Sequence, residues 1–216
     1  MMLTRFMLNP ARRGTMKLLG SPQAMHAAVM ASFLPGDETD GAHGRVLWRV
    51  DSDGREHSLY VLSPATPDLT HLVEQAGWPT RSTWDSRPYE PLLGRLQADQ
   101  VWAFRLRANP TKLARDVGKR VGHVSADQQA SWLLDRAPRQ GFEVCGGGDG
   151  TPSLRVTDRQ KRAFRRDQDS VTLVTARYDG LLRITDVDAF RGVLVHGLGR
   201  AKGYGCGLMT LARPEP

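Results

Sequence analysis

Short stretches of alternating apolar and polar residues run along the first half of the chain, which is the pattern of half-buried β-strands. They cover Leu3–Leu8, Arg45–Val50 and Ser58–Leu62, and a further extended piece follows Arg87–Glu90. Two segments between them have helical spacing. One begins at Ser21-Pro22, a favourable helix start, and the other follows Pro67-Asp68. The order strand, helix, strand, strand, helix, strand is that of a ferredoxin-like unit.

The second half of the chain repeats this order without repeating the sequence. Residues 100–108 alternate well, with Trp102, Phe104 and Leu106 on one face. Further strands are expected at Phe142–Cys145, Ser153–Thr157, Val171–Tyr178, Leu181–Ile184 and Leu208–Ala212. Helices are expected after Ser125 and after Asp186 or Asp188. We therefore predict an α+β fold of two tandem ferredoxin-like domains, residues 1–95 and 96–216. Each antiparallel sheet is expected to carry helices on one face.

Charge is divided unevenly between these halves. The 216 residues carry a net charge of +7; residues 1–98 hold 10 basic and 10 acidic side chains, whereas residues 99–216 hold 20 and 13. A basic half beside a neutral half favours a surface that binds a polyanion such as nucleic acid. The same excess is also compatible with a role in solubility alone.

Composition narrows the class of protein further. No apolar run is long enough to span a membrane, and Arg5 interrupts the short apolar stretch at the amino end, so we expect a cytoplasmic protein without a signal peptide. Cys145 and Cys206 form no C-x-x-C pair and have no histidine at ligand spacing. We therefore expect no metal site and no cofactor.

The most distinctive stretch is His196–Gly207, in which five glycines alternate with two cations. Glycine allows left-handed dihedrals and close approach of another backbone. The order helix, glycine loop, strand excludes a dinucleotide fingerprint, and no Walker sequence occurs. We interpret the stretch as a phosphate cradle, with a flexible tight connection as the alternative. Its candidate RNA-binding residues are Gly199, Arg200, Lys202 and Gly203.

A second basic segment, residues 158–166, lies between two expected strands and is interpreted as a hairpin tip. Its cations could follow the phosphates on both sides of a nucleic-acid groove, and each contact would add to the salt dependence of binding. A solvated charged hairpin is the alternative. Its candidate RNA-binding residues are Arg159, Lys161, Arg162, Arg165 and Arg166, to which the basic region 112–122 adds Lys112, Lys119 and Arg120.

Three of the six histidines adjoin these features or the first helix. His26 lies beside the apolar face formed by Met25 and Val29, where a lone histidine is more often structural, so periodicity does not select it. His123 follows a glycine in the basic region and is a candidate phosphate contact. His196 borders the glycine stretch, where it either faces a substrate or ends its helix.

Several motifs together resemble one family. They are Leu3–Pro10, Pro22–His26, Ala108-Asn-Pro-Thr-Lys112, Lys119-Arg-Val-Gly-His123, Trp132-Leu133 with Gly141-Phe142, Leu182-Arg-Ile-Thr-Asp186 and Gly197–Leu211. In these motifs the chain resembles the CasE family, the CRISPR RNA-processing endoribonucleases of subtype I-E. The resemblance extends over nearly the whole chain, and the glycine string together with Ala-Asn-Pro-Thr-Lys is quite specific to that family.

The resemblance implies RAMP-type ferredoxin-like domains and metal-independent cleavage of the CRISPR repeat transcript at the base of its hairpin. It also implies that the enzyme keeps its crRNA and joins the other subunits of the Cascade complex. It maps the catalytic histidine of the family to His26 and the basic hairpin of the family to residues 158–166. Some members carry a catalytic tyrosine three residues before this histidine, where this chain has Gln23.

This chemistry needs few protein groups, because RNA supplies its own nucleophile. The 2′-hydroxyl attacks the adjacent phosphate, expels the 5′-oxygen and leaves a 2′,3′-cyclic phosphate. His26 could remove the hydroxyl proton or protonate the leaving oxygen, and Arg200 or Lys202 could stabilise the phosphorane. Two other functions stay open. One is a non-catalytic RNA-hairpin-binding subunit of a ribonucleoprotein. The other is a nucleotide-binding enzyme, which the order helix, glycine loop, strand disfavours.

Overall fold

The chain forms two compact units in a computed structural model. The structure describes residues 1–216 except 55, 115–117, 149, 167–168 and 215–216, and it does not describe the side chains of residues 165–170. The first unit comprises Met1–Arg95 and Lys202–Leu208, and the second comprises Leu96–Ala201 and Met209–Pro216. The expected boundary near residue 96 separates these two units except at Lys202–Leu208, which groups with the first unit. This segment carries half of the glycine-rich stretch into the first unit.

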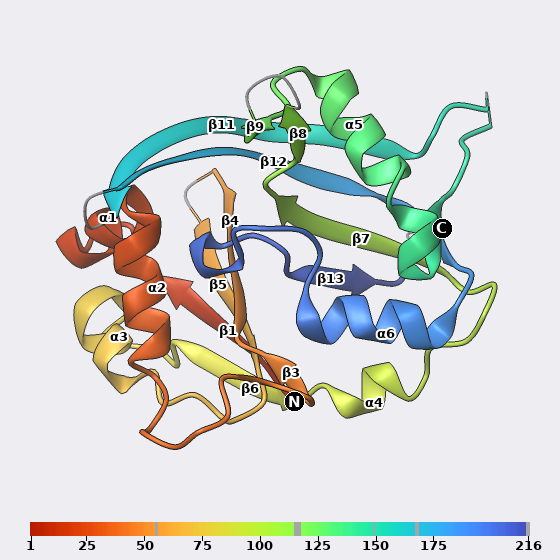
Figure 1. Ribbon diagram of the computed structural model, residues 1–216. Helices are drawn as coiled ribbons and strands as arrows, with labels where there is room; N and C mark the ends of the chain where they lie inside the picture. Colours follow the sequence, from red (N-terminus) through yellow and green to blue (C-terminus); the bar gives the residue numbers. More distant parts are fainter. Residues whose placement is uncertain (55, 115–117, 149, 167–168, 215–216) are drawn as a thin grey trace. The chain divides into compact units, whose positions relative to one another are not determined.

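The first unit is a four-stranded antiparallel sheet packed against helices (Figure 1). Its strands have the order β4-β5-β1-β6, and its core joins residues of β1 and β5 to residues of the helices, including Met25 and Val29. The elements are β1 (Met2–Leu8), α1 (Arg13–Gly20), α2 (Pro22–Met30), β4 (Leu47–Asp53), β5 (Glu56–Ser63), α3 (Thr70–Ala76), β6 (Trp84–Pro88) and α4 (Glu90–Leu93), with a small pair β2 (Asp40–Gly41) and β3 (Gly44–Arg45).

Local sequence explains some of these elements. The Ser21 hydroxyl accepts a hydrogen bond from the Ala24 amide at 3.1 Å, and Pro22 occupies the first turn of α2, as the sequence predicts. Helix α1 was not predicted, and one expectation was wrong: the fourth strand lies at Trp84–Pro88, before Glu90 and not after it.

The second unit repeats this arrangement, with sheet order β10-β12-β7-β13. In both units the strands are ordered second, third, first, fourth, which is the ferredoxin-like order. The predicted tandem ferredoxin-like α+β fold is therefore confirmed. The elements are β7 (Val101–Ala108), β8 (Thr111–Ala114), β9 (Lys119–Gly122), α5 (Ala126–Leu134), η1 (Ala137–Gln140), β10 (Phe142–Val144), β11 (Leu154–Arg166), β12 (Asp169–Ile184), α6 (Val187–His196) and β13 (Met209–Ala212).

Strands β11 and β12 form a long antiparallel hairpin in this unit. The turn expected at Asp179-Gly180 is wrong, because β12 runs through it for 16 residues. Gly180 allows a close approach instead: a Cβ atom there would lie 2.2 Å from the carbonyl oxygen of Ser153. Residues 158–166 are accordingly part of strand β11 and not a loop at the tip.

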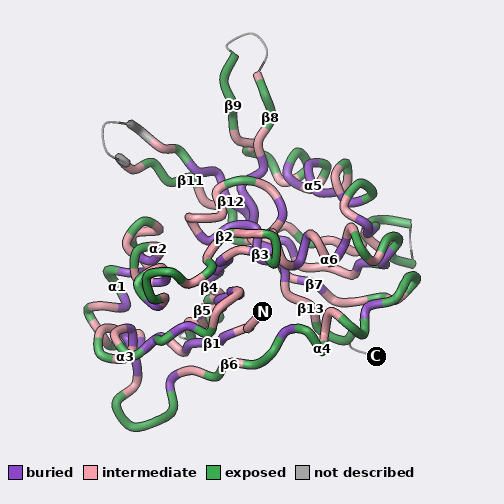
Figure 2. The backbone as a smooth tube through the Cα atoms, turned by 60° about the horizontal axis from the view of Figure 1, so that its bottom comes forward, coloured by how far each residue is buried: buried purple, intermediate pink, exposed green. Residues whose placement is uncertain are grey.

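A second hairpin, β8–β9, occupies the basic region around Lys112, for which no strands were predicted. Both hairpins project from the second unit, and Figure 2 shows exposed residues in green along β8, β9 and β11, whereas Leu173–Ala176 of β12 are buried. Between β7 and β8, the Asn109 side-chain oxygen accepts a hydrogen bond from the Val174 amide at 3.2 Å. Asn109 of the Ala-Asn-Pro-Thr-Lys motif thus holds β12 by a hydrogen bond at the point where the β11–β12 hairpin leaves the sheet. Among the described residues no helix combines the length and apolar character needed to cross a membrane.

Candidate active site and nucleic-acid interface

The glycine-rich segment Lys202–Leu208 lies against helix α2 in the first unit. It begins with a short 3-10 turn, η2 (Lys202–Tyr204). A Cβ atom built on Gly203 would lie 3.4 Å from Nε2 of His26, 3.6 Å from Cε1 and 3.7 Å from Cδ2. The Nε2 edge of the imidazole therefore faces the bare backbone of Gly203, and any side chain at residue 203 would lie over it. The structure thus brings together three predicted site residues: His26, Lys202 and Gly203.

The position of His26 follows from the packing of α2. Met25 and Val29 are fully buried in the core of the first unit. His26 is one residue further, about 100° around the helix, so it lies at the margin of the core and is half-buried. Gln23 is almost one turn earlier on the same side and is exposed. Its neutral amide can hydrogen-bond to a substrate but cannot exchange a proton as a tyrosine or histidine can.

Two anchors hold this segment in the first unit, and the first is a glycine packed on a tryptophan. Gly205 has φ +77° and is buried against Trp48: a Cβ atom there would lie 2.6 Å from the indole ring. Trp48 belongs to the hydrophobic core of the unit. Residue 205 must therefore be glycine for two reasons, a left-handed backbone and the absence of space.

The second anchor is Arg49, whose side chain is almost completely buried. Its Nε and Nη2 donate to the two carboxylate oxygens of Asp51 at 2.7 and 2.9 Å, and its Nη1 donates to the Leu208 carbonyl at 3.0 Å. The guanidinium also stacks over the Tyr60 ring, 5.5 Å from its centroid. Arg49 thus fixes the end of the glycine-rich segment, a role that its place in an alternating strand did not indicate.

Replacing Gly205 with alanine is expected to destabilise the protein by about 2–4 kcal/mol, since it combines a strained backbone with overpacking against Trp48. Thermal and urea unfolding measure this effect. Gly192→Ala is the matched control, because Gly192 lies in α6 and a Cβ atom there would meet nothing within 4 Å. The control is expected to be neutral or slightly stabilising. Equal stability of the two variants would contradict the packing described for residue 205.

Lys202 lies in a positively charged part of the first unit. Burial lowers the pKa of its ammonium, and Arg45 lowers this pKa further, while Asp40 opposes both. Arg45 is half-buried and forms an ion pair with Asp40 at 3.3 Å. An anion held beside Lys202 would offset the repulsion from Arg45. Arg45 is thus a second cation of this region that the sequence did not single out.

The remaining part of the glycine-rich stretch belongs to the second unit. Gly199, with φ +81°, lies against the indole of Trp132: a Cβ atom there would be 3.2 Å from two ring carbons. Arg200 is exposed. His196 is the last residue of α6, and Gly197 follows as its C-cap. The predicted single cradle is therefore divided: Lys202 and Gly203 lie in one unit, and Gly199 and Arg200 in the other.

The basic segment of β11 presents its cations to solvent. Arg159, Lys161 and Arg162 are exposed, while the side chains of Arg165 and Arg166 lie outside the described part of the chain. Asp158, the one acid of the segment, forms an ion pair with Arg107. A bulge interrupts the register with β12 between Thr157 and Gln160. Lys161 and Arg162 follow in the paired strand, so their side chains point to opposite faces of the hairpin.

The β8–β9 hairpin carries the other predicted cations. Lys112, Lys119 and Arg120 are all exposed. The hairpin is fixed at its base by Gly122, where a Cβ atom would lie 2.5 Å from a side-chain carbon of Val174 in β12. The two basic hairpins of the second unit are therefore joined through one contact.

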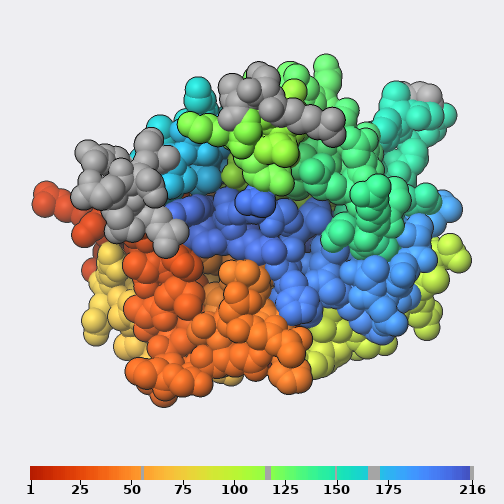
Figure 3. Space-filling model, in the orientation of Figure 1, coloured from red at the N-terminus to blue at the C-terminus, as the bar shows by residue number. Residues whose placement is uncertain are grey.

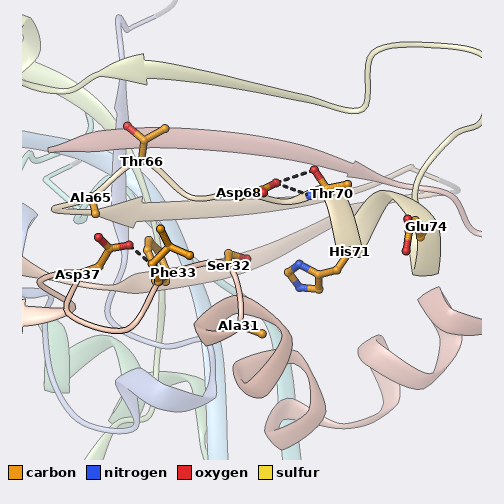
Figure 4. Close-up of a pocket in the computed structure, with 11 residues that line it drawn as sticks. Ala31, Ser32, Phe33, Asp37, Ala65, Thr66, Asp68, Thr70, His71 and Glu74 are labelled. Carbon is orange, nitrogen blue, oxygen red and sulfur yellow. Dashed lines mark hydrogen bonds between the residues drawn. The ribbon is translucent and has the colours of Figure 1, made fainter.

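The first unit also contains a pocket of about 540 Å³ that is separate from His26 (Figure 4). Its polar groups serve local structure. Asp37 accepts a hydrogen bond from the Leu34 amide at 2.8 Å, Asp68 accepts two from Thr70, and His71 pairs with the Ala28 carbonyl at 2.9 Å. With its acidic lining this pocket is unsuited to RNA. Among the described residues no group of three His, Cys, Asp or Glu side chains is placed to hold a metal ion.

Comparisons with known proteins identify the class to which this fold and this site belong. The family described as "CRISPR associated protein" matches residues 1–213, and the chain belongs to that family. The resemblance predicted from the sequence motifs is thereby confirmed.

Named relatives specify the group within the family. The chain is 30% identical to the CRISPR-associated endoribonuclease Cse3 of Thermus thermophilus, over 98% of this chain and 100% of the relative. It is 28% identical to the Cascade subunit CasE of Escherichia coli, over 73% of this chain and 82% of the relative. Among solved structures, Thermus thermophilus Cse3 bound to an RNA representing a pre-cleavage complex matches with a TM-score of 0.81 and 28% identity, covering 98% of each chain.

Proposed function

We propose that this protein is an endoribonuclease that cleaves CRISPR repeat transcripts at the base of the repeat hairpin and retains the crRNA as a subunit of Cascade. The names of Cse3 and CasE, an endoribonuclease and a Cascade subunit, support the activity and the partners. The observation that carries the proposal is the Nε2 edge of His26 lying against the side-chain-free backbone of Gly203. A transcript made in the cell is met in the cytoplasm, which is where we place the protein.

His26 is the proposed catalytic residue. The 2′-hydroxyl of the scissile nucleotide attacks the adjacent phosphorus, the bond to the 5′-oxygen breaks, and the products carry a 2′,3′-cyclic phosphate and a 5′-hydroxyl. One proton leaves the 2′-oxygen and one is added to the 5′-oxygen. An imidazole can perform either transfer near neutral pH, because its ordinary pKa is about 6.5. Since the nucleophile is part of the RNA, the step requires no metal-bound water.

The cations around His26 would stabilise the charge that develops in this step. Lys202 stands one residue before Gly203, and Arg45 acts on the same ammonium. Preorganised donors aimed at developing charge are typically worth 10²–10³ in rate, or roughly 3–4 kcal/mol. The exposed cations of β11 would bind the phosphates of the RNA stem, which is recognised by its shape and backbone.

A single atom in the RNA tests this mechanism. A repeat RNA with a 2′-deoxy residue at the scissile nucleotide is expected to bind normally and to resist cleavage completely, because the nucleophile is missing. EDTA is expected to leave cleavage of the all-ribose RNA unchanged. Denaturing gels and mapping of the product ends measure both effects. Cleavage of the deoxy substrate at the same phosphate, or a requirement for Mg²⁺, would contradict the proposed mechanism.

The second candidate is a non-catalytic subunit that only binds the RNA hairpin. Gln23 favours it, because an exposed amide stands beside His26 where some relatives have a catalytic tyrosine. This candidate predicts tight binding of the repeat hairpin and intact RNA after prolonged incubation. The cleavage assay therefore separates the two functions directly.

A further inference from the structure

One group of cations in the second unit surrounds a histidine that the proposed reaction does not use. His123 lies between β9 and α5, and its backbone is held from both sides. Its amide donates to the Pro110 carbonyl at 2.9 Å, and its carbonyl accepts from Nε2 of Gln129 at 2.8 Å. The side chain is half-buried, and its Nδ1 atom is buried with no hydrogen-bond partner among the described residues. The backbone that carries the imidazole is thus held in place, and one ring nitrogen is shielded from solvent.

Arg136 is the second member of this group, and it follows α5. Its Nη1 donates to the Trp132 carbonyl at 3.0 Å, and its guanidinium lies over the Trp132 ring, 4.7 Å from the centroid. Burial lowers the pKa of Arg136; the carboxylate of Asp135 opposes this effect and Arg120 adds to it. A guanidinium held flat on an aromatic ring is preorganised to bind an oxyanion with its remaining donors.

We propose that His123, Arg136 and Lys112 form a phosphate-binding site for the RNA at the base of the basic hairpins. This inference rests on the proposed function, which supplies the RNA. The site adjoins the β11–β12 hairpin: Gly122, the residue before His123, packs on Val174, and Val174 stands opposite Lys161 in the strand register. Figure 3 shows the light green hairpin beside the green α5 on one exposed face of the second unit.

Lys112 and Arg136 place two positive charges beside the imidazole of His123, against the single negative charge of Asp135. Burial lowers the pKa of His123, and Lys112 and Arg136 lower it further, while a hydrogen bond from the imidazole to the side chain of Gln128 and the charge of Asp135 oppose them. In the free protein these facing groups therefore favour the neutral form of the imidazole. A phosphate bound to Lys112 and Arg136 cancels their repulsion and raises the pKa of His123. Binding at this site therefore takes up a proton.

An RNA backbone is the anion that the surroundings favour. The site is continuous with two hairpins whose exposed side chains are mostly cations, and Gly199 lies on the Trp132 ring that also supports Arg136. A strand of RNA that leaves the stem bound at β11 would pass over this region. The site would then hold the RNA at a point that is distinct from His26 and takes no part in the chemistry.

The test is RNA binding in a His26→Ala background, so that cleavage does not enter the measurement. Arg136→Gln is expected to weaken binding of the repeat hairpin RNA about tenfold and to lower the salt slope by about 0.7–0.9, the share of one phosphate contact. Arg139→Gln removes the same charge from an exposed residue three positions away and is expected to change affinity less than twofold. Arg136→Lys is expected to retain most of the affinity.

A pH series provides the second measurement. Between pH 7.5 and 6.0 the affinity of the His26→Ala protein is expected to rise about three- to tenfold more than that of the same protein with His123→Gln, because only the former can take up the proton. Equal loss in Arg136→Gln and Arg139→Gln, parallel pH curves, or a lowered Tm with equal loss in Arg136→Lys would overturn the site. Absence of any RNA binding by the unsubstituted protein would instead contradict the proposed function.

Discussion

His26→Ala is expected to bind the repeat hairpin as tightly as the unsubstituted protein and to cleave it at least 10³-fold more slowly. A positioned acid or base contributes typically 10²–10⁴ in rate, and the three atoms nearest to a Cβ built on Gly203 all belong to His26. The imidazole is at the margin of the core and not within it, so its removal leaves the packing of Met25 and Val29 intact. Single-turnover cleavage at saturating protein, with binding measured separately, checks both halves of the prediction.

The matched control is His43→Ala, which removes an exposed histidine of the same unit and is expected to cleave at the unsubstituted rate. Thermal unfolding of both variants excludes a general loss of fold. If His26→Ala cleaved within tenfold of the unsubstituted protein at the same phosphate, His26 would have no catalytic role.

The second large effect is expected on affinity. Replacing Arg159, Lys161 and Arg162 together with glutamine is expected to weaken RNA binding about 10²–10³-fold at physiological salt. It should also lower the salt slope by roughly two to three, since each phosphate contact on a duplex contributes about 0.9. All three side chains are exposed, so the fold should not change. At saturating protein the bound RNA should still be cleaved, because His26 is untouched.

A control with the same change in net charge separates this surface from a general attraction. Arg81, Arg87 and Arg95 are exposed cations of the first unit. Their joint replacement by glutamine is expected to weaken binding no more than about threefold. If both triple variants lost the same affinity, the RNA would be held by overall charge and not by β11.

Signals confined to a few neighbouring residues predicted the structure well. Ser21 and Ser125 were predicted to begin helices, and either Asp186 or Asp188 was expected to begin the last one; Ser21, Ser125 and Asp186 each accept a hydrogen bond at the first turn. The alternation over 100–108 and the repeated element order were sufficient for the ferredoxin-like fold. These features depend on the periodicity of apolar residues and on helix capping, and both involve only residues that are close together in the sequence.

Features that depend on distant contacts were missed. The sequence offered no reason for Lys202–Leu208 to join the first unit, because its anchors Trp48 and Arg49 lie more than 150 positions away. Arg49 stands in an alternating strand and resembles a solvent-facing residue, yet its pairing with Asp51 and Leu208 buries it. The interrupted strand expected at Asp179-Gly180 was a similar error, since the close approach of Ser153 is what requires that glycine.

The candidate site was accessible from the sequence only in part. The periodicity of α2 placed His26 beside a core face, where histidines are mostly structural, and the family resemblance alone selected it. The reason for its special position is spatial: Gly203 has no side chain to cover the Nε2 edge. The cluster of His123 with Arg136 had one visible sign, the basic region 112–122, but the stacking of Arg136 on Trp132 could not be read from the chain.

The most direct measurement is a crystal structure of the protein with a repeat RNA that carries a 2′-deoxy residue at the scissile nucleotide. The account predicts that the scissile phosphate lies beside Gly203, with a ring nitrogen of His26 within about 3.5 Å of the 5′-oxygen or of the position that the missing 2′-oxygen would occupy. A stem bound along β11 with its cleavable phosphate more than about 8 Å from the imidazole, and another side chain in its place, would contradict it.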